Sequence, residues 1–192
     1  SEQALSEADV IVEGVYHTPA QEHVFFNTES GIGYFGEDDC LELIVTGQWA
    51  HKDRTQIAHA LNLPEEKVRV KYPVIGGAFG GREDIGIQIV LGLAALKLRE
   101  RGINRPVKAV LSREESTIDH GRRRPFKIYT RWGAKKNGKV TAAEVKLYAD
   151  GGAYLFTTPV VGAVAALSCV GPYEIPNVTV DSFDVYTNNV PR

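Results

Sequence analysis

The sequence predicts an α+β protein in which mixed β-sheets pack against helices. Runs of alternating apolar and polar residues, typical of strands, recur along the 192 residues. Segments with helical periodicity lie between them, but strands and helices do not alternate strictly as they do in parallel β–α–β folds. Asn137-Gly138 lies between two alternating runs, which is a strong signal for a β-hairpin.

The expected elements are bounded by turn-forming residues. Strands are expected over residues 10–16, 31–36, 41–46, 68–75, 107–111, 126–133, 140–148 and 178–186. Helices are expected over residues 49–61, where Asn62 and Pro64 end the pattern, and over 84–101, before Gly102. Ser112 and Glu115 form a capping box, which predicts a short helix after residue 112. Residues 153–166 are compatible with a helix or a loop.

The composition excludes several classes of function. Apolar residues make up 43% and charged residues 24%, as in soluble globular proteins, and the net charge of −2 favours neither nucleic acid nor an anionic membrane. No apolar segment reaches the roughly 18 residues of a membrane span, and the N-terminus shows no signal peptide. Cys40 and Cys169 lie far apart, outside any Cys-x-x-Cys pattern. We therefore expect two buried free thiols, no zinc or iron–sulfur site within the chain, and a cytoplasmic location.

The most informative feature is a glycine-rich loop between an expected strand and an expected helix. It reads Gly76-Gly77-Ala78-Phe79-Gly80-Gly81-Arg82-Glu83. Four glycines in six positions allow the backbone to approach a ligand closely and to adopt positive φ angles. Exposed amides in such a loop can hold an anion or a metal-bound oxygen. The loop is therefore a candidate binding site, with Phe79 as its only large apolar side chain.

The residues around the glycines limit the other interpretations of this loop. A P-loop requires lysine and then serine or threonine after the glycines, whereas Arg82 and Glu83 follow here, so a P-loop is excluded. A dinucleotide fingerprint requires glycine at the position of Ala78 and an acidic residue at the end of a following strand, which the sequence lacks. The sequence does not exclude a third interpretation, in which the loop is a tight turn that binds no ligand.

Several motifs together make the chain resemble the large molybdenum subunit of the xanthine dehydrogenase and aldehyde oxidase family. The main matches are the glycine loop and the upstream segment Gln21-Glu22-His23. Further matches, in the family's order, are Arg124-Pro125-Phe126, residues 137–140, residues 150–154, residues 172–176 and Thr187-Asn188. The resemblance covers nearly the whole chain. It identifies residues 1–192 as a partial molybdopterin-binding domain, the N-terminal part of that region in a longer large subunit.

The resemblance implies a molybdenum hydroxylase that oxidises an aldehyde or an N-heterocycle, a small-molecule substrate, with oxygen from water. The metal is carried by a molybdopterin cofactor, so no protein side chain need be an equatorial ligand. Electrons leave through iron–sulfur clusters, usually to FAD, on other domains or subunits. The implied partners are those domains or subunits and a second molybdopterin-binding domain. The general base lies beyond residue 192, so the isolated fragment is expected to be inactive.

The resemblance also assigns roles to individual residues. Gln21 matches a glutamine whose amide contacts a molybdenum oxygen, and Phe79 belongs to the loop whose backbone lies against that ligand. These two are the residues expected nearest the metal, and Ala78, Gly80 and Gly81 complete the cofactor-binding set. Glu83 matches a carboxylate that faces the substrate in purine-oxidising members and is the candidate catalytic residue. Each residue also has a non-functional interpretation. Gln21 would then be a solvated loop residue, and Glu83 would be a carboxylate at a helix N-terminus, where the helix dipole stabilises it by about 0.3–1 kcal/mol.

The sequence departs from the family pattern in two places, and two other functions stay open. Asn27 stands where many relatives have glutamate. Residues 164–167 lack the arginine that purine oxidisers carry there, which weakens a purine assignment and leaves aldehydes and other heterocycles. His23 is expected to shape the loop, and the scattered His120 is not expected to bind a metal. The alternative functions are a non-catalytic assembly domain of the same fold and a nucleotide-binding oxidoreductase domain.

Overall fold

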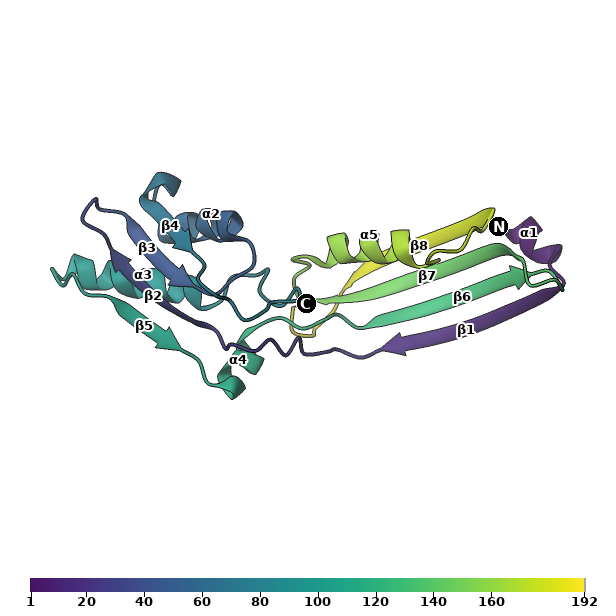
Figure 1. Ribbon diagram of the computed structural model, residues 1–192, viewed down its shortest axis with the longest axis horizontal. Coiled ribbons are helices and arrows are strands. Elements are labelled where there is room, and N and C mark those ends of the chain that lie inside the picture. The colour runs from purple at the N-terminus through teal and green to yellow at the C-terminus, as the bar shows by residue number, and fades with distance from the viewer. Residues whose placement is uncertain (192) are drawn as a thin grey trace. The chain divides into compact units, whose positions relative to one another are not determined.

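The computed structural model describes residues 1–191 and divides into two compact units (Figure 1). The first unit consists of Ser1–Gln21 and the segment from Arg122 onward, and the second unit consists of Glu22–Gly121. Each unit contains one four-stranded sheet with both parallel and antiparallel pairs. The predicted α+β class with mixed sheets is confirmed.

The sheet of the second unit has the strand order β4-β3-β2-β5. Its strands are β2 (Ser30–Phe35), β3 (Leu41–Val45), β4 (Val68–Lys71) and β5 (Val107–Val110). β2 pairs antiparallel with β3 and with β5, whereas β3 and β4 run parallel. The carboxyl ends of β3 and β4 therefore meet at one edge of the sheet, and the segments that follow these two strands begin side by side.

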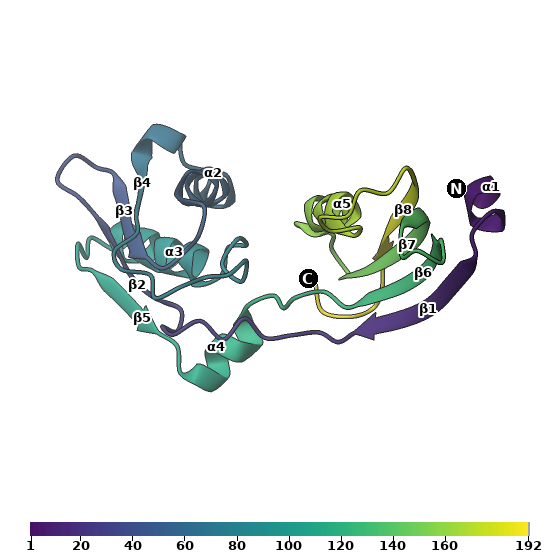
Figure 2. The ribbon, with the colours of Figure 1, turned by 45° about the vertical axis from the view of Figure 1, so that its right-hand side comes forward.

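Two helices pack on this sheet, α2 (Ala50–Leu61) and α3 (Ile87–Glu100) (Figure 2). Leu43, Ile57 and Leu91, one from β3 and one from each helix, are at most 1% exposed. Burying a side chain of this size stabilises a fold by about 1.5–3 kcal/mol. α2 ends at Leu61, and Asn62, the predicted stop, follows it in the left-handed conformation. This core fixes the edge from which the glycine loop leaves the sheet.

The first unit has a sheet of order β1-β6-β7-β8 with α5 on one face (Figure 2). Its elements are α1 (Glu2–Ser6), β1 (Val10–Thr18), β6 (Phe126–Ala134), β7 (Val140–Gly152), α5 (Thr158–Ser168) and β8 (Asn177–Tyr186). The predicted hairpin at Asn137-Gly138 joins β6 to β7, and Gly138 has a φ of +87°. The amide of Gly138 donates to the carbonyl of Lys135 over 2.9 Å, which closes the turn.

Several predicted boundaries shift for identifiable reasons. The strand expected to reach residue 75 ends at Lys71, because Pro73 has no amide to donate to a neighbouring strand. The helix expected from residue 84 begins only at Ile87, after Gly86 in a non-helical conformation. The segment left open as helix or loop, residues 153–166, contains most of α5, which has proline in its first turn and extends to Ser168. α1 and the short 3-10 helix η1 (Glu65–Lys67) were not predicted, since neither is long enough to show periodicity.

The capping box is confirmed, and the cysteine prediction is confirmed in part. Ser112 and Glu115 exchange both capping hydrogen bonds at the start of α4 (Arg113–Asp119). Cys40 is free and buried, whereas Cys169 is free but only partly buried, which corrects the expectation of two buried thiols. Among residues 1–191, no helix combines the length and the apolar character that crossing a membrane requires.

Candidate functional site

The glycine loop of the second unit adopts a backbone that requires its glycines. Gly76, Gly77 and Gly80 have φ angles of +64°, +94° and +89°. Phe79 also lies in the left-handed region, at +56°, where residues other than glycine are uncommon. Its side chain is 63% exposed. The loop is thus a bare turn that presents one aromatic side chain outward, and a strained residue of this kind is often found at a functional site.

The loop packs closely against residues 23–27 at Gly76 and Gly81, and less closely at Gly80. A Cβ atom at Gly81 would lie 2.8 Å from the His23 ring and 2.9 Å from the Phe25 ring. A Cβ atom at Gly76 would lie 2.6 Å from the side chain of Asn27. At Gly80, in contrast, the nearest heavy atoms would be 3.8 Å away. Gly76 and Gly81 therefore allow close packing against residues 23–27, whereas a Cβ atom at Gly80 would make only ordinary van der Waals contacts.

Arg82 holds the loop from the inside. Its side chain is 3% exposed and pairs with Glu29 over 3.2 Å. The same guanidinium donates to the carbonyls of Ile75 and Gly77 over 2.5 and 2.8 Å, and to the carbonyl of Asn27. Burial lowers the pKa of Arg82, and the neighbouring Glu29 carboxylate opposes this effect. Sequence analysis used Arg82 to exclude a P-loop and as part of the family motif, and it missed this anchoring role.

Glu22, His23 and His120 form a cluster beside the loop. Their potential ligand atoms lie within 4.8 Å of one another, so the cluster has the donor set of a metal site. However, Oε1 of Glu22 already contacts Nε2 of His120 directly, over 2.5 Å. Burial alone would raise the pKa of Glu22, but hydrogen bonds from His120 and from the amide of Val24 lower it overall. We interpret the cluster as a structural hydrogen-bonded contact that joins the start of the second unit to the end of α4.

Gln48 connects Gly80 and Glu83 of the loop through hydrogen bonds, and sequence analysis did not find it. Its Oε1 accepts a hydrogen bond from the Gly80 amide over 3.1 Å, and its Nε2 donates to Oε1 of Glu83 over 3.2 Å. Gln48 follows β3, whose carboxyl end lies beside that of β4, the strand from which the loop departs. A polar residue at the end of an adjacent parallel strand is the signal that could have identified Gln48.

A buried polar network supports the turn that carries Gln48. The hydroxyl of Tyr72 donates to Oδ2 of Asp53 over 2.5 Å, and Nε2 of Gln88 donates to the carbonyl of Thr46 over 3.1 Å. Asp53 is fully buried. Burial raises its pKa, although hydrogen bonds from Tyr72 and Gln88 act in the opposite direction.

Replacing Asp53 with asparagine is expected to make stability less dependent on pH. Because folding raises the pKa of Asp53 above 3.8, its contribution is most favourable below pH 3.8 and is lost as the pH rises through the raised value. As the pH rises over this interval, the free energy of unfolding of Asp53→Asn should therefore increase relative to that of the parent protein, by about 1.4 kcal/mol per unit of pKa difference. Denaturant unfolding between about pH 3.5 and 7.5 measures this, with the exposed Asp181→Asn as the control for charge. A constant difference across the range would contradict the prediction.

The structure brings together all but one of the residues that the sequence singled out. Ala78, Phe79, Gly80, Gly81 and Glu83 share the loop, where the amide of Gly81 donates to the carbonyl of Ala78 over 2.9 Å. Ala78 is buried, and Glu83 is partly exposed. The amides of Gly80 and Gly81 are thus both engaged within the protein.

Gln21 belongs to the first unit, where its backbone pairs with Arg123 in an isolated antiparallel bridge. Its side chain is exposed. The contacts within the second unit therefore do not include Gln21, and the expectation that Gln21 and Phe79 lie near the same metal ligand stays a prediction.

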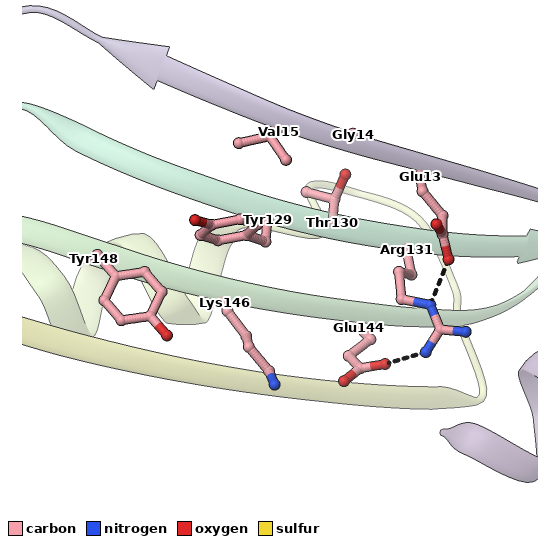
Figure 3. Close-up of a pocket in the computed structure, with 9 residues that line it drawn as sticks. All are labelled: Glu13, Gly14, Val15, Tyr129, Thr130, Arg131, Glu144, Lys146 and Tyr148. Carbon is pink, nitrogen blue, oxygen red and sulfur yellow. Dashed lines mark hydrogen bonds and ion pairs between the residues drawn. The ribbon is translucent and has the colours of Figure 1, made fainter.

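A hollow on the first unit carries none of the predicted residues (Figure 3). It has a volume of about 620 Å³ and lies over β1, β6 and β7. Arg131 crosses it and pairs with Glu13 and Glu144 over 2.7 and 3.2 Å. These ion pairs connect neighbouring strands, and we interpret them as part of a sheet face that is partly open to solvent.

Comparison with known proteins defines the class to which this fold and loop belong. The family model described as "Molybdopterin cofactor-binding domain" matches residues 1–192. The aldehyde oxidoreductase from Desulfovibrio gigas has the same fold, with a TM-score of 0.89 at 24% identity over 98% of this chain and 20% of that protein. The chain therefore belongs to the molybdopterin cofactor-binding domain family.

Curated relatives of higher identity are molybdenum-dependent oxidoreductases. The chain is 38% identical to the nicotinate dehydrogenase large molybdopterin subunit of Eubacterium barkeri, over 97% of this chain and 43% of the relative. It is 34% identical to the xanthine dehydrogenase/oxidase of Gallus gallus, over 97% of this chain and 14% of the relative. The chain thus spans less than half the length of these relatives. The family resemblance seen in the sequence is confirmed.

Proposed function

We propose that this chain contributes part of the molybdenum cofactor site of a hydroxylase that oxidises an aldehyde or an N-heterocycle at carbon. The observation that carries the proposal is the bare, left-handed turn at residues 76–81, in a chain that matches the molybdopterin-binding family over its whole length. Relatives named for nicotinate, xanthine and aldehyde support both substrate classes. A second molybdopterin-binding domain would complete the pocket. Iron–sulfur clusters and FAD elsewhere in a cytoplasmic enzyme would accept the electrons.

The loop fits such a cofactor. Its glycines remove side chains from the surface that a ligand would approach, and at Gly80 even a Cβ atom would come no closer than 3.8 Å to Glu83 and His23. A molybdopterin brings its own sulfur ligands, so a site without nearby thiols is consistent with it. Of the two cysteines, Cys40 hydrogen-bonds the carbonyls of Asp38 and Glu66 and so has a local structural role. When bound, the cofactor supplies the redox chemistry, and the protein supplies binding and orientation.

Each predicted residue has a role that follows from its chemistry. Residues 78–81 would form the surface against which the cofactor lies, and Gln21 would hold it through its side-chain amide. The exposed Phe79 ring would exclude water from the pocket. Glu83 would bind a polar atom of the substrate and fix its orientation. The base that removes the proton from water belongs to a part of the protein outside this chain.

The position of Glu83 favours a substrate role over a helix-capping role. α3 begins at Ile87 with Gly86 as its N-cap, and no acidic residue lies in its first turn. Glu83 therefore lies before the helix and outside the turn where the helix dipole acts. Its carboxylate is held by Gln48 instead.

The full enzyme that contains this chain provides the test. Elemental analysis should find about one molybdenum per chain, and turnover of xanthine, nicotinate, quinoline or benzaldehyde in ¹⁸O-labelled water should give labelled product. Glu83→Gln should reduce kcat/KM about 10–100-fold, as expected for a lost hydrogen bond to a charged group, at unchanged molybdenum content. The exposed Glu66→Gln is the matched control.

The two alternative functions give different results in this experiment. A correctly assembled protein without molybdenum would favour a non-catalytic assembly domain. Saturable binding of NAD or FAD to the second unit, abolished by changes in the glycine loop, would favour a nucleotide-binding domain.

A further inference from the structure

We propose that Glu22 is a positioning residue that holds Val24 in a strained, left-handed backbone conformation and thereby sets the position of the glycine loop. This role comes in addition to the contact that Glu22 makes with the end of α4. The inference rests on the proposed function, because its consequence is the shape of the loop against which the cofactor would lie. It concerns only residues of the second unit.

The backbone of Val24 has a conformation that its side chain does not favour. Four residues other than glycine have a positive φ among residues 1–191. Asp39 and Asn62 have short polar side chains that tolerate this conformation, and Phe79 belongs to the glycine loop itself. Val24, at +50°, is β-branched and therefore a genuine outlier. Its side chain is 70% exposed, so its own packing does not explain the conformation, and the surroundings must hold it.

Hydrogen bonds hold Val24 from both sides along the chain. Before it, Oε1 of Glu22 accepts from the Val24 amide over 3.3 Å. The same oxygen lies 2.5 Å from Nε2 of His120, whose side chain is 6% exposed, so the carboxylate is anchored to the buried end of α4. After it, the amide of Phe26 donates to the carbonyl of Gly76 over 3.1 Å. The strained residue thus lies between an anchored carboxylate and the start of the glycine loop.

The turn at Val24 allows two rings to contact the same glycine. In an extended segment, Cα atoms two residues apart are separated by about 6.5 Å. A left-handed residue is compact like a helical one, so it brings His23 and Phe25 closer together than this. A Cβ atom at Gly81 would lie 2.8 Å from the first ring and 2.9 Å from the second. The Phe25 ring is in turn fixed by burial and by Arg82, 3.9 Å from its centre. Loss of the turn would therefore displace the rings against which the loop packs.

The two roles of Glu22 predict different results when Val24 is replaced. Glycine adopts a positive φ about as readily as a negative one, so Val24→Gly keeps the turn available without strain. If Glu22 holds the turn, Val24→Gly should compensate for the loss of Glu22. If Glu22 only contacts His120, Val24→Gly should not compensate, because it leaves that contact missing.

The experiment uses the purified full enzyme with four changes in this chain. Glu22→Met keeps a side chain of similar length and removes the acceptor. Val24→Gly removes the strain, and the double variant Glu22→Met/Val24→Gly tests compensation. Asn137→Leu is the matched control, because Oδ1 of Asn137 accepts from the amide of Lys139 over 3.0 Å, across the same two-residue spacing, in the hairpin of the first unit.

Hydrogen–deuterium exchange reports on the loop without requiring turnover or cofactor. For the peptide covering residues 76–86, Glu22→Met should accelerate exchange about tenfold, because a hydrogen bond to a charged group is lost. The double variant should return to within about threefold of the parent rate. Val24→Gly alone should slow exchange of the peptide covering residues 22–27 about fivefold, because relief of strain makes local opening less favourable. Asn137→Leu should match the parent in both peptides.

Turnover should follow the exchange results. With the substrate that the parent enzyme oxidises, Glu22→Met should lower kcat/KM about tenfold, and the double variant should recover most of this loss. Val24→Gly alone should keep kcat/KM within about twofold of the parent, because the turn is retained. A residue with a structural role only would not be compensated by a change at position 24.

Two outcomes would overturn the proposal. Exchange in the double variant as fast as in Glu22→Met would reduce the role of Glu22 to its contact with His120. Unchanged or faster exchange of residues 22–27 in Val24→Gly would show that Val24 is not strained, and this comparison decides the matter even if Glu22→Met fails to assemble. A parent enzyme without molybdenum but with the expected exchange pattern would contradict the proposed function and still support the positioning role.

Discussion

Replacing Arg82 with methionine is expected to destabilise the second unit by about 3–5 kcal/mol, the usual cost of breaking a buried ion pair from one side. Glu29, 8% exposed, would keep its charge without a counterion, although Ser116 still donates to it. The carbonyls of Ile75 and Gly77 would lose their shared donor where the chain turns into the glycine loop. We therefore expect loss of loop order together with loss of stability.

Denaturant unfolding of the full chain measures this effect, and molybdenum content measured on the full enzyme reports on the loop. The control is Arg69→Met, because Arg69 also pairs with carboxylates, those of Asp38 and Glu42, but is 46% exposed. Exposed pairs contribute about 0–1 kcal/mol, so the control should unfold almost like the parent. A loss below about 1 kcal/mol in Arg82→Met would refute the anchoring role.

Adding a methyl group at Gly81 is expected to reduce turnover by about 100-fold, since displacement of a reacting group by about 1 Å can have this effect. The new atom in Gly81→Ala would overlap the rings of His23 and Phe25. Phe25 is fully buried and cannot retreat, so the loop itself must move. Phe79 and Glu83 would be displaced with it, and molybdenum content should fall as well.

Gly138→Ala is the matched control, because it adds the same methyl group to a glycine turn that lies outside the proposed site. Nothing lies within 4 Å of that position, so only the φ of +87° is unfavourable, at a cost of about 1 kcal/mol. Its turnover should equal that of the parent. If Gly81→Ala retained turnover within about threefold, the close packing of the loop would not matter for function.

The sequence by itself determined the features that depend on neighbouring residues. Alternation along β1, β6 and β7 predicted strands, because period-two patterning is a property of one segment. Asn137-Gly138 predicted the hairpin and Ser112 with Glu115 predicted the start of α4, since turns and caps are closed by residues close together in the chain. The glycine loop was found for the same reason, as the φ angles at Gly76 and Gly80 are local requirements.

Only the tertiary structure decided which residues support that loop. Gln48 is separated from Glu83 by 35 positions, Glu29 from Arg82 by 53 and Glu22 from His120 by 98. No local pattern encodes such pairs, because they form when the parallel pairing of β3 with β4 and the docking of α4 bring distant segments together. A buried arginine and a bridging glutamine look ordinary in sequence, and burial and the direction of a hydrogen bond are what give them a role.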